Sequence, residues 1–351
     1  MGASRRAFLS LPLAFGALLL ILFAAGGRAD TFDDSGRTRD YRFMMGTSVE
    51  VEAYGGTDAI RREAIDAAFK AIAEIDRLMS NYRDDSELSL INRLAADRPV
   101  RVSEPMLAVL AAGLRVSAKS HGAFDMTVGP LVKLWGFHDQ RPHLPSAREL
   151  AVVRPLVDYR QVLIDDRARS VRFARAGVEL DLGGIAKGFA VEVAANTLRQ
   201  KNLRGFIDAG GNQYLLGTPP GKRTWTVGIK DPDRPDRLLG VVETQETSVS
   251  TSADYATFVE LNGRKYGHLL DPRTLQPSDA ALSATVLSRD GTLADAMSKA
   301  AFLLGPTEGL ALVDSFPGMS AVVAYRRPNG TIALAISPRI RTAFHPVAPG
   351  P

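Results

Sequence analysis

The sequence predicts a single α+β domain in which helices and strands are mixed along the chain. Hydrophobic and polar residues alternate over several short segments, which indicates strands. Between them, hydrophobic residues recur at three- and four-residue spacing, which indicates amphipathic helices, the longest over residues 57–79. No linker-like segment and no internal repeat divides the 351 residues. The domain is expected over residues 41–340, between a flexible polar lead-in over residues 30–40 and a tail over residues 341–351.

The expected elements follow one another with short connections. Helices are expected over residues 57–79, 87–94, 104–120, 186–198 and 292–304. Strands are expected over residues 41–54 (interrupted at Gly46), 178–181, 204–209, 225–230, 239–243, 282–287, 319–325 and 330–336. The run over 178–181, the helix after it and the strand from residue 204 are expected to form a β–α–β unit. Residues 142–155 are predicted to be a surface loop or short helix, and residues 161–173 a hairpin.

The composition excludes several classes of protein. The chain has no cysteine, which rules out disulfides, thiolate chemistry, iron–sulfur clusters and a lipid attached through an N-terminal cysteine. The five histidines are scattered and do not show the spacing of a zinc site. The formal charge is +4, but Arg5, Arg6 and Arg28 contribute three of these charges. The near-neutral remainder gives no electrostatic reason to expect nucleic acid as a partner.

The first 29 residues have the pattern of an export signal. Arg5 and Arg6 precede a run without charged residues, and its apolar centre over residues 11–25 is short for a membrane span. The opening SRRAFLS resembles a twin-arginine export signal, and cleavage is expected after Ala29. The chain is therefore predicted to reach the periplasm. The alternative is an uncleaved N-terminal anchor in the inner membrane that faces the periplasm.

A glycine turn at Gly183 and Gly184 suggests a site for an anion. Asp181 precedes the turn, and Lys187 follows it at the start of a predicted helix. The first amides of a helix have no partners within the helix and carry partial positive charge, so this arrangement suits a metal-bound phosphate. It equally suits an ordinary turn in which Asp181 caps the helix. A Rossmann enzyme is not expected, because the chain lacks a G-x-G-x-x-G motif after a strand.

Three other polar residues have a structural as well as a functional explanation. Asp125 lies in a glycine-bracketed apolar stretch, so its carboxylate needs a specific donor, which can be structural. Asp295 is placed to close a capping box that begins at Thr292 and to pair with Lys299 one turn later. His268 lies in a polar turn, where a histidine is either a surface residue or a base.

Taken together, the motifs resemble one family. They are MGTS (45–48), NYRDDSELSLIN (81–92), GAFDMTVGPL (122–131), DLGGIAKGFA (181–190), DAGGN (208–212), STSADY (250–255), HLLDPRT (268–274) and ADAMSKAAFLLG (294–305). The set and its order are similar to the FAD:protein FMN transferase family, the ApbE-like proteins. This resemblance implies a T-fold-like mixed α/β domain of the ApbE-like type.

The resemblance assigns binding roles to single residues. It implies FAD contacts at Met45, Tyr82, Ala123, Phe124, Asp125, Asp181, Lys187 and Leu269. It also implies a Mg²⁺ ion held by the backbone carbonyl of Gly184 and the carboxylate of Asp295. Lys299 stands where the family pattern has a threonine ligand, and the neighbouring Ser298 is predicted to supply that oxygen instead.

The implied reaction moves FMN from FAD to a Ser or Thr hydroxyl of a partner protein and releases AMP. His268 is expected to activate the hydroxyl, and magnesium to neutralise the charge that develops on the pyrophosphate. The expected partner is a membrane-associated electron-transfer flavoprotein. Two alternatives stay open. The chain is either an FAD pyrophosphate hydrolase that gives FMN and AMP, or a non-catalytic FAD-binding protein in which Lys299 fills the cation site.

Overall fold

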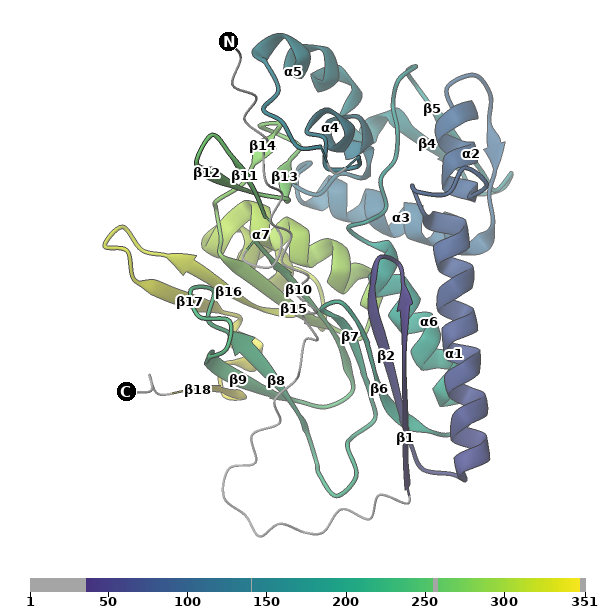
Figure 1. Cartoon of the computed structure of the whole chain (residues 1–351), viewed down its shortest axis with the longest axis vertical. Coiled ribbons are helices and arrows are strands. Elements are labelled where there is room, and N and C mark those ends of the chain that lie inside the picture. The colour runs from purple at the N-terminus through teal and green to yellow at the C-terminus, as the bar shows by residue number, and fades with distance from the viewer. Residues whose placement is uncertain (1–35, 140, 255–257, 348–351) are drawn as a thin grey trace, which may run out of the picture.

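An eight-stranded antiparallel sheet forms the centre of the structure, a computed structural model that describes residues 36–139, 141–254 and 258–347 (Figure 1). In spatial order its strands are β1 (Arg37–Met44), β2 (Thr47–Tyr54), β6 (Arg204–Ala209), β7 (Asn212–Leu216), β10 (Thr247–Ala253), β15 (Ser283–Ser288), β16 (Ser320–Arg326) and β17 (Ile332–Ile336). The predicted export signal over residues 1–29 lies outside the described residues.

Smaller sheets surround the central one. They consist of β3 (Val100–Arg101), β5 (Ser170–Phe173) and β4 (Val162–Asp165); of β18 (Phe344–Pro346), β9 (Leu238–Thr244) and β8 (Trp225–Lys230); of β11 (Phe258–Leu261) and β12 (Arg264–Gly267); and of β13 (Leu270–Asp271) and β14 (Gln276–Pro277). The predicted hairpin over residues 161–173 is confirmed as β4 and β5.

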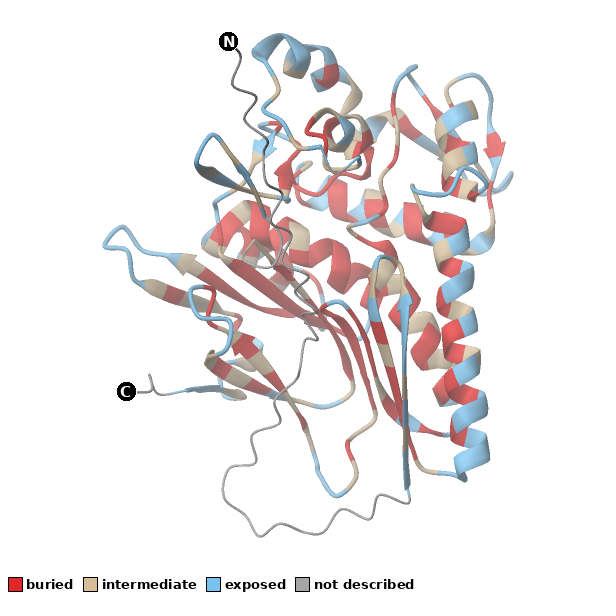
Figure 2. Ribbon diagram, viewed as in Figure 1, coloured by how far each residue is buried: buried red, intermediate tan, exposed pale blue. Residues whose placement is uncertain are grey.

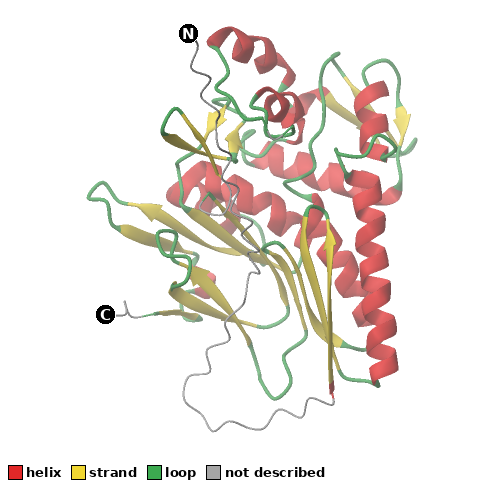
Figure 3. Ribbon diagram, viewed as in Figure 1, coloured by secondary structure: helices red, strands yellow, loops and turns green. Residues whose placement is uncertain are grey.

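Helices cover one face of the central sheet (Figure 3). The helices in contact with this face are α1 (Asp58–Met79), α6 (Ala186–Gln200) and α7 (Gly291–Asp314). The other helices are α2 (Glu87–Leu94), α3 (Glu104–Lys119), α4 (Gly129–Leu134) and α5 (Ala147–Val153), with 3₁₀ turns η2 (Met126–Val128), η3 (Arg154–Leu156), η4 (Tyr159–Gln161) and η5 (Pro338–Ile340). The side chains of Thr57, Ser86 and Ser103 cap α1, α2 and α3. These caps and the hydrophobic periodicity explain why the three helices lie where the sequence predicts them.

Alternation of side chains along the strands gives the sheet two different faces. Leu215, Val249, Leu287 and Val322 point to the face covered by β8 and β9, where they form one hydrophobic cluster. Among their sequence neighbours, Tyr214, Leu216, Val286, Ala321 and Val323 belong to the main core on the helix side, which also contains the buried sides of α1, α6 and α7. Figure 2 shows α7 buried along most of its length, whereas the outer side of α1 is exposed. The main core thus lies between the sheet and helices α1, α6 and α7.

Helix α7 begins and bends at identifiable residues. Asp290 is its N-cap, because the Asp290 side chain accepts a hydrogen bond of 2.8 Å from the Leu293 N–H. The capping-box explanation of Asp295 is therefore wrong. The predicted end at Leu304 coincides with a kink at Gly305, whose φ of 75° interrupts the helix before Pro306.

The predicted β–α–β unit is wrong, because residues 178–182 form no strand. The Asn92 side chain satisfies the backbone of this segment instead, with hydrogen bonds of 2.8 Å to the Leu180 N–H and 3.0 Å to the Leu180 carbonyl. The Asp181 N–H donates to the Met126 carbonyl at 2.7 Å. The segment is therefore an extended connection whose hydrogen-bond partners lie far away in the sequence, where local alternation does not reveal them.

Both ends of the domain contain more structure than the sequence predicts. The predicted flexible lead-in over residues 30–40 overlaps β1, which begins at Arg37 and pairs with β2. The single interrupted strand over residues 41–54 is a hairpin that turns at Met45 and Gly46. The predicted tail over residues 341–351 contains β18, which pairs with β9.

Asp208 makes the stability of the fold depend on pH. The Asp208 carboxylate is buried in β6, where it accepts from the Gly211 N–H at 3.0 Å and from the Gln213 side chain at 2.8 Å. Burial outweighs these hydrogen bonds and raises the pKa of Asp208 to about 6. Between pH 4 and 6 the folded state therefore keeps a proton that the unfolded state has released. The free energy of unfolding accordingly falls as the pH rises through this window.

We expect the substitution Asp208→Asn to remove this loss of stability. We compare urea unfolding of the two proteins at pH 4.5 and pH 7. Between these pH values the free energy of unfolding of the wild type should fall by about 1–2 kcal/mol more than that of the variant. An equal difference between the two proteins at both pH values would contradict this assignment.

Candidate active site

A polar cluster in the core is centred on the carboxylate of Asp295 in α7. The residue has no exposed surface. Its Oδ2 accepts a hydrogen bond of 2.8 Å from the Gly188 N–H, in the first turn of α6. Its Oδ1 accepts from the Lys299 ammonium and lies 3.4 Å from the Ser250 hydroxyl. The buried negative charge is therefore balanced by a cation and by the N-terminus of a helix.

Lys299 lies one turn after Asp295 on α7, and its side chain is only 15% exposed. Burial lowers the pKa of Lys299, the neighbouring Asp295 opposes this, and the positive charge of Lys187 lowers the pKa further. Both lysines lie at the glycine turn, because Lys187 donates to the Gly183 carbonyl and the Lys299 side chain lies beside Gly184. The predicted pairing of Asp295 with Lys299 one turn later is therefore confirmed, and the pair is buried.

Ser298 joins α7 to strand β10 through hydroxyl groups. The Ser298 hydroxyl lies 2.8 Å from the Asp295 carbonyl, 3.1 Å from the Ser250 hydroxyl and 2.8 Å from the Ser252 hydroxyl. Ser250 in turn lies 2.6 Å from Oδ1 of Asn212 at the start of β7. A continuous polar network therefore runs from the turn between β6 and β7 to the buried side of α7.

The glycine turn meets this cluster. A Cβ atom added at Gly184 would lie 3.2 Å from the Phe124 ring and 3.8 Å from Cγ of Lys299. Lys187 donates to the Gly183 carbonyl at 3.3 Å. Oδ1 of Asp181 accepts from the Gly183 N–H at 2.7 Å, so this carboxylate closes the turn. It does not cap α6, whose N-cap residue, Ile185, makes no side-chain capping bond.

Helices α6 and α7 cap each other where they approach most closely. Asp295 of α7 accepts the Gly188 N–H of α6, and Glu192 of α6 accepts the Gly291 N–H of α7 at 2.8 Å. A Cβ atom at Gly188 would lie only 2.1 Å from the Gly291 carbonyl oxygen and 2.5 Å from Cβ of Asp295. Glycine at this position therefore allows the contact that holds Asp295 in place.

The segment with Ala123, Phe124 and Asp125 is buried beside the glycine turn. Oδ1 of Asp125 accepts from the N–H and the hydroxyl of Thr127 at 2.8 and 2.7 Å, and Oδ2 accepts from the Tyr159 N–H at 2.7 Å. The predicted specific donor of Asp125 is therefore confirmed. Burial raises the pKa of Asp125 in spite of these hydrogen bonds. Three donors thus fix the orientation of this carboxylate.

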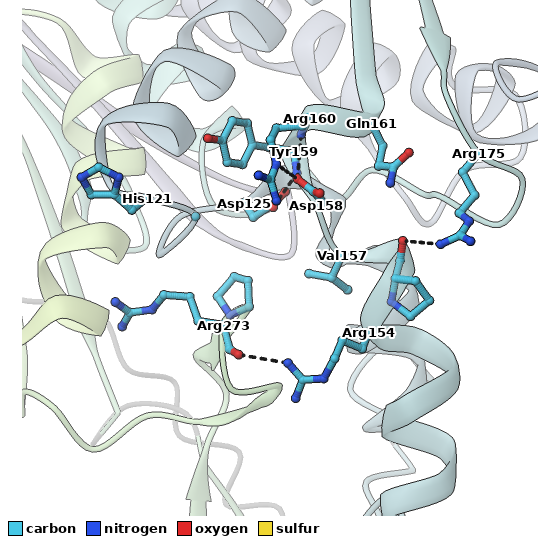
Figure 4. Close-up of a pocket in the computed structure, with 13 residues that line it drawn as sticks. His121, Asp125, Arg154, Val157, Asp158, Tyr159, Arg160, Gln161, Arg175 and Arg273 are labelled. Atoms are coloured by element: carbon cyan, nitrogen blue, oxygen red, sulfur yellow. Dashed lines mark hydrogen bonds and ion pairs between the residues drawn. The ribbon is translucent and has the colours of Figure 1, made fainter.

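A cavity of about 550 Å³ opens beside Asp125 (Figure 4). Its lining contains four arginines, namely Arg154, Arg160, Arg175 and Arg273. Asp158 pairs with Arg160 at 2.8 Å, whereas the partner of Arg154 among the described residues is a backbone carbonyl, that of Arg273, at 3.3 Å. The rim of the cavity is therefore positively charged, and the cavity shares Asp125 with the predicted FAD contacts.

Tyr82 presents an exposed aromatic face in the loop between α1 and α2. Its ring is stacked on that of His138, with 4.8 Å between the ring centroids and 1° between the planes. Desolvation raises the pKa of Tyr82, and the negative charges of Asp181 and Asp139 raise it further. The face of the Tyr82 ring thus already accommodates a planar ring.

The structure places the remaining predicted residues on the surrounding loops. Met45 occupies the turn between β1 and β2 with a φ of 51°, which is uncommon for a residue other than glycine, and packs against the main core. Leu269, between β12 and β13, also packs against the main core. His268 precedes it and is exposed. The catalytic role of His268 stays a prediction.

The comparisons with known proteins identify the family. A sequence model described as the ApbE family matches residues 45–323. The chain belongs to the ApbE family. It is 32% identical to an FAD:protein FMN transferase of Treponema pallidum, with 93% of this chain and 94% of the relative covered, and 31% identical to one of Klebsiella pneumoniae, with 88% and 94% covered.

Solved structures support the same assignment. The ApbE protein of Thermotoga maritima superposes with a TM-score of 0.79 at 30% identity, covering 88% of this chain and 99% of the other. The flavin transferase ApbE of Vibrio cholerae gives a TM-score of 0.77 at 26% identity with the same coverage. The predicted family and mixed α/β fold of the ApbE-like type are therefore confirmed. No helix among the residues that the structure describes combines the length and apolar character needed to cross a bilayer.

The sequence did not predict a role for three residues of the polar cluster around Asp295. They are Gly188, which contributes a backbone N–H, and Ser250 and Ser252, which contribute hydroxyls. The two serines had a detectable signal. Alternate residues of a strand point to one face, so the S-x-S pattern of β10 places both hydroxyls toward α7. The role of Gly188 depends on a contact between two helices and has no local signal.

The donors around Asp295 do not fit the Mg²⁺ ion that the resemblance implies. Magnesium requires several oxygen ligands, but Oδ2 of Asp295 faces an N–H and Oδ1 faces an ammonium. At ~4 Å and an effective dielectric constant of ~20, Lys299 would repel Mg²⁺ by on the order of 8 kcal/mol, which cancels the attraction of one carboxylate at that distance. The described residues contain no group of three or more His, Asp or Glu placed to hold a metal ion.

Proposed function

We propose that this chain is an FAD:protein FMN transferase that modifies an electron-transfer flavoprotein in the periplasm. The observation that carries the proposal is the meeting of the glycine turn, Phe124 and Lys299 beside the buried Asp295. The curated relatives from Treponema pallidum and Klebsiella pneumoniae have this activity as their name. The periplasmic location rests on the export-signal pattern of residues 1–29.

In the proposed reaction a Ser or Thr hydroxyl oxygen of the acceptor attacks the phosphorus of the FMN half of FAD. A new P–O bond joins FMN to the acceptor, and the bond between that phosphorus and the bridging oxygen breaks. AMP leaves with the bridging oxygen, and His268 takes the hydroxyl proton. His268 is exposed, so a protein acceptor can reach it.

The residues of this chain would bind and orient FAD rather than form bonds with it. Lys187 and Lys299 supply positive charge near the glycine turn, where the pyrophosphate is expected. Tyr82 offers its face to the flavin ring, which would take a place like that of His138. Asp125 and Asp181 hold the backbone around them in fixed conformations.

Incubation with FAD and the apo form of a membrane electron-transfer subunit that carries FMN through a phosphoester distinguishes three activities. We expect an intact-mass increase of the acceptor by one FMN less a water, together with AMP. Free FMN and AMP would instead indicate a hydrolase, and bound but unchanged FAD a binding protein. Either result would overturn the transferase proposal.

The variant His268→Ala tests the assigned base. We expect it to transfer FMN at least ~100-fold more slowly, because general-base catalysis contributes about that much or more. FAD affinity, measured by equilibrium dialysis, should change little. A variant that retained full transfer would exclude His268 as the base.

A further inference from the structure

We infer that the Lys299 ammonium is a built-in cation that binds the FAD pyrophosphate in place of a divalent metal ion. The inference rests on the proposed function, since it assigns the counter-charge of the same FAD site. Lys299 is a position at which this chain departs from the family pattern. The side-chain contacts of Lys299 are the observations that support the inference.

The position of Lys299 suits this role. Its Cγ and Cδ lie next to Gly184, at 3.8 and 3.9 Å from a Cβ atom built on that glycine. Lys187 donates to the carbonyl of the preceding glycine, Gly183, at 3.3 Å. Two cations thus flank the turn after which α6 begins, and a pyrophosphate carries two negative charges. The site therefore offers matching charge without a metal ion.

The ammonium is also held in a fixed place. Asp295 and the Ser298 hydroxyl, at 3.4 Å, are its hydrogen-bond partners among the described residues, and they take two of its three N–H donors. The third donor is available to a phosphate oxygen. Because the side chain is mostly buried before FAD arrives, little rotamer entropy remains to be lost on binding.

The Asp295 carboxylate accepts a hydrogen bond from a second donor, so the Lys299 ammonium can also bind another anion. The Gly188 N–H at the start of α6 donates to Oδ2 of Asp295, on the carboxylate oxygen that Lys299 does not contact. Asp295 is thus stabilised by the helix N-terminus as well as by Lys299. A buried ion pair alone seldom adds stability, so a role in ligand binding gives this pair a reason to be retained.

Equilibrium dialysis of FAD against the full chain tests the inference, with FAD integrity checked by chromatography. The wild type should bind FAD with the same affinity in EDTA and in Mg²⁺. Lys299→Thr should bind at least ~10-fold more weakly in EDTA and regain affinity in Mg²⁺, because a threonine oxygen and a freed carboxylate can then ligate the ion. Lys299→Met, which restores neither charge nor oxygen, should stay weak in both conditions.

The comparison of wild-type FAD affinity in EDTA and in Mg²⁺ tests the inference even if a variant fails to fold. FAD binding that requires Mg²⁺ would overturn the inference while leaving the proposed function intact. No FAD binding in either condition would overturn the proposed function itself. Lys201→Thr is the matched control, because Lys201 lies at the other end of α6 and pairs with Glu63 at 2.8 Å. Its FAD affinity should equal that of the wild type.

Discussion

Replacing Asp295 with alanine is expected to lower the free energy of unfolding by about 3–5 kcal/mol, the cost of leaving one partner of a buried ion pair without the other. Asp295 has no exposed surface, and its removal leaves the Lys299 ammonium without its counter-charge. It also leaves the Gly188 N–H without its acceptor at the start of α6. Urea unfolding at neutral pH measures the loss directly.

A double variant separates the ion pair from the rest of this cost. In Asp295→Ala/Lys299→Met no charge remains buried, so we expect much of the lost stability to return. If the double variant were as unstable as the sum of the two single variants, Asp295 and Lys299 would not be energetically coupled. The buried ion pair would then be incidental to the stability of α7.

Gly188→Ala is expected to lower the free energy of unfolding by about 3 kcal/mol, the upper part of the range for overpacking. The new Cβ would lie 2.1 Å from the Gly291 carbonyl oxygen and 2.5 Å from Cβ of Asp295. The first of these is a backbone atom, so α6 and α7 must move apart to make room. We also expect weaker FAD binding, because the hydrogen bond from Gly188 to Asp295 lengthens as the helices separate.

Gly36→Ala is the control for the glycine substitution. A Cβ atom at Gly36 would meet nothing within 4 Å, so its stability should match that of the wild type. Guanidinium unfolding of both variants compares a crowded with an open glycine. An unchanged stability of Gly188→Ala would mean that the close contact between α6 and α7 is not needed.

The sequence alone predicts those elements whose signals are local. Helices α1, α2 and α3 have hydrophobic periodicity and a serine or threonine cap, and the structure confirms them nearly to the residue. The strand that the sequence predicts over residues 178–181 is wrong, because the hydrogen-bond partner of this extended segment is Asn92, far away in the chain. The capping-box explanation of Asp295 failed for a similar reason, since the partner of its carboxylate is Gly188 of another helix.

The candidate site was predicted by resemblance more than by pattern. Taken singly, Asp125, Asp181 and Asp295 each had an adequate structural explanation, and only the ordered set of motifs pointed to FAD. The structure adds what alignment to a family pattern does not contain. It shows that the Lys299 ammonium contacts Asp295 next to Gly184, where the resemblance places a metal ion.

Metal-free transfer of FMN by this chain is tested by following FAD, AMP and acceptor-bound FMN in one reaction over time. The full chain, FAD and the acceptor subunit are mixed in EDTA, AMP is quantified by chromatography and attached FMN by intact mass. We expect AMP and covalently bound FMN to rise in equal amounts without added metal. AMP that accumulates without attached FMN, or a reaction that starts only when Mg²⁺ is added, would contradict this expectation.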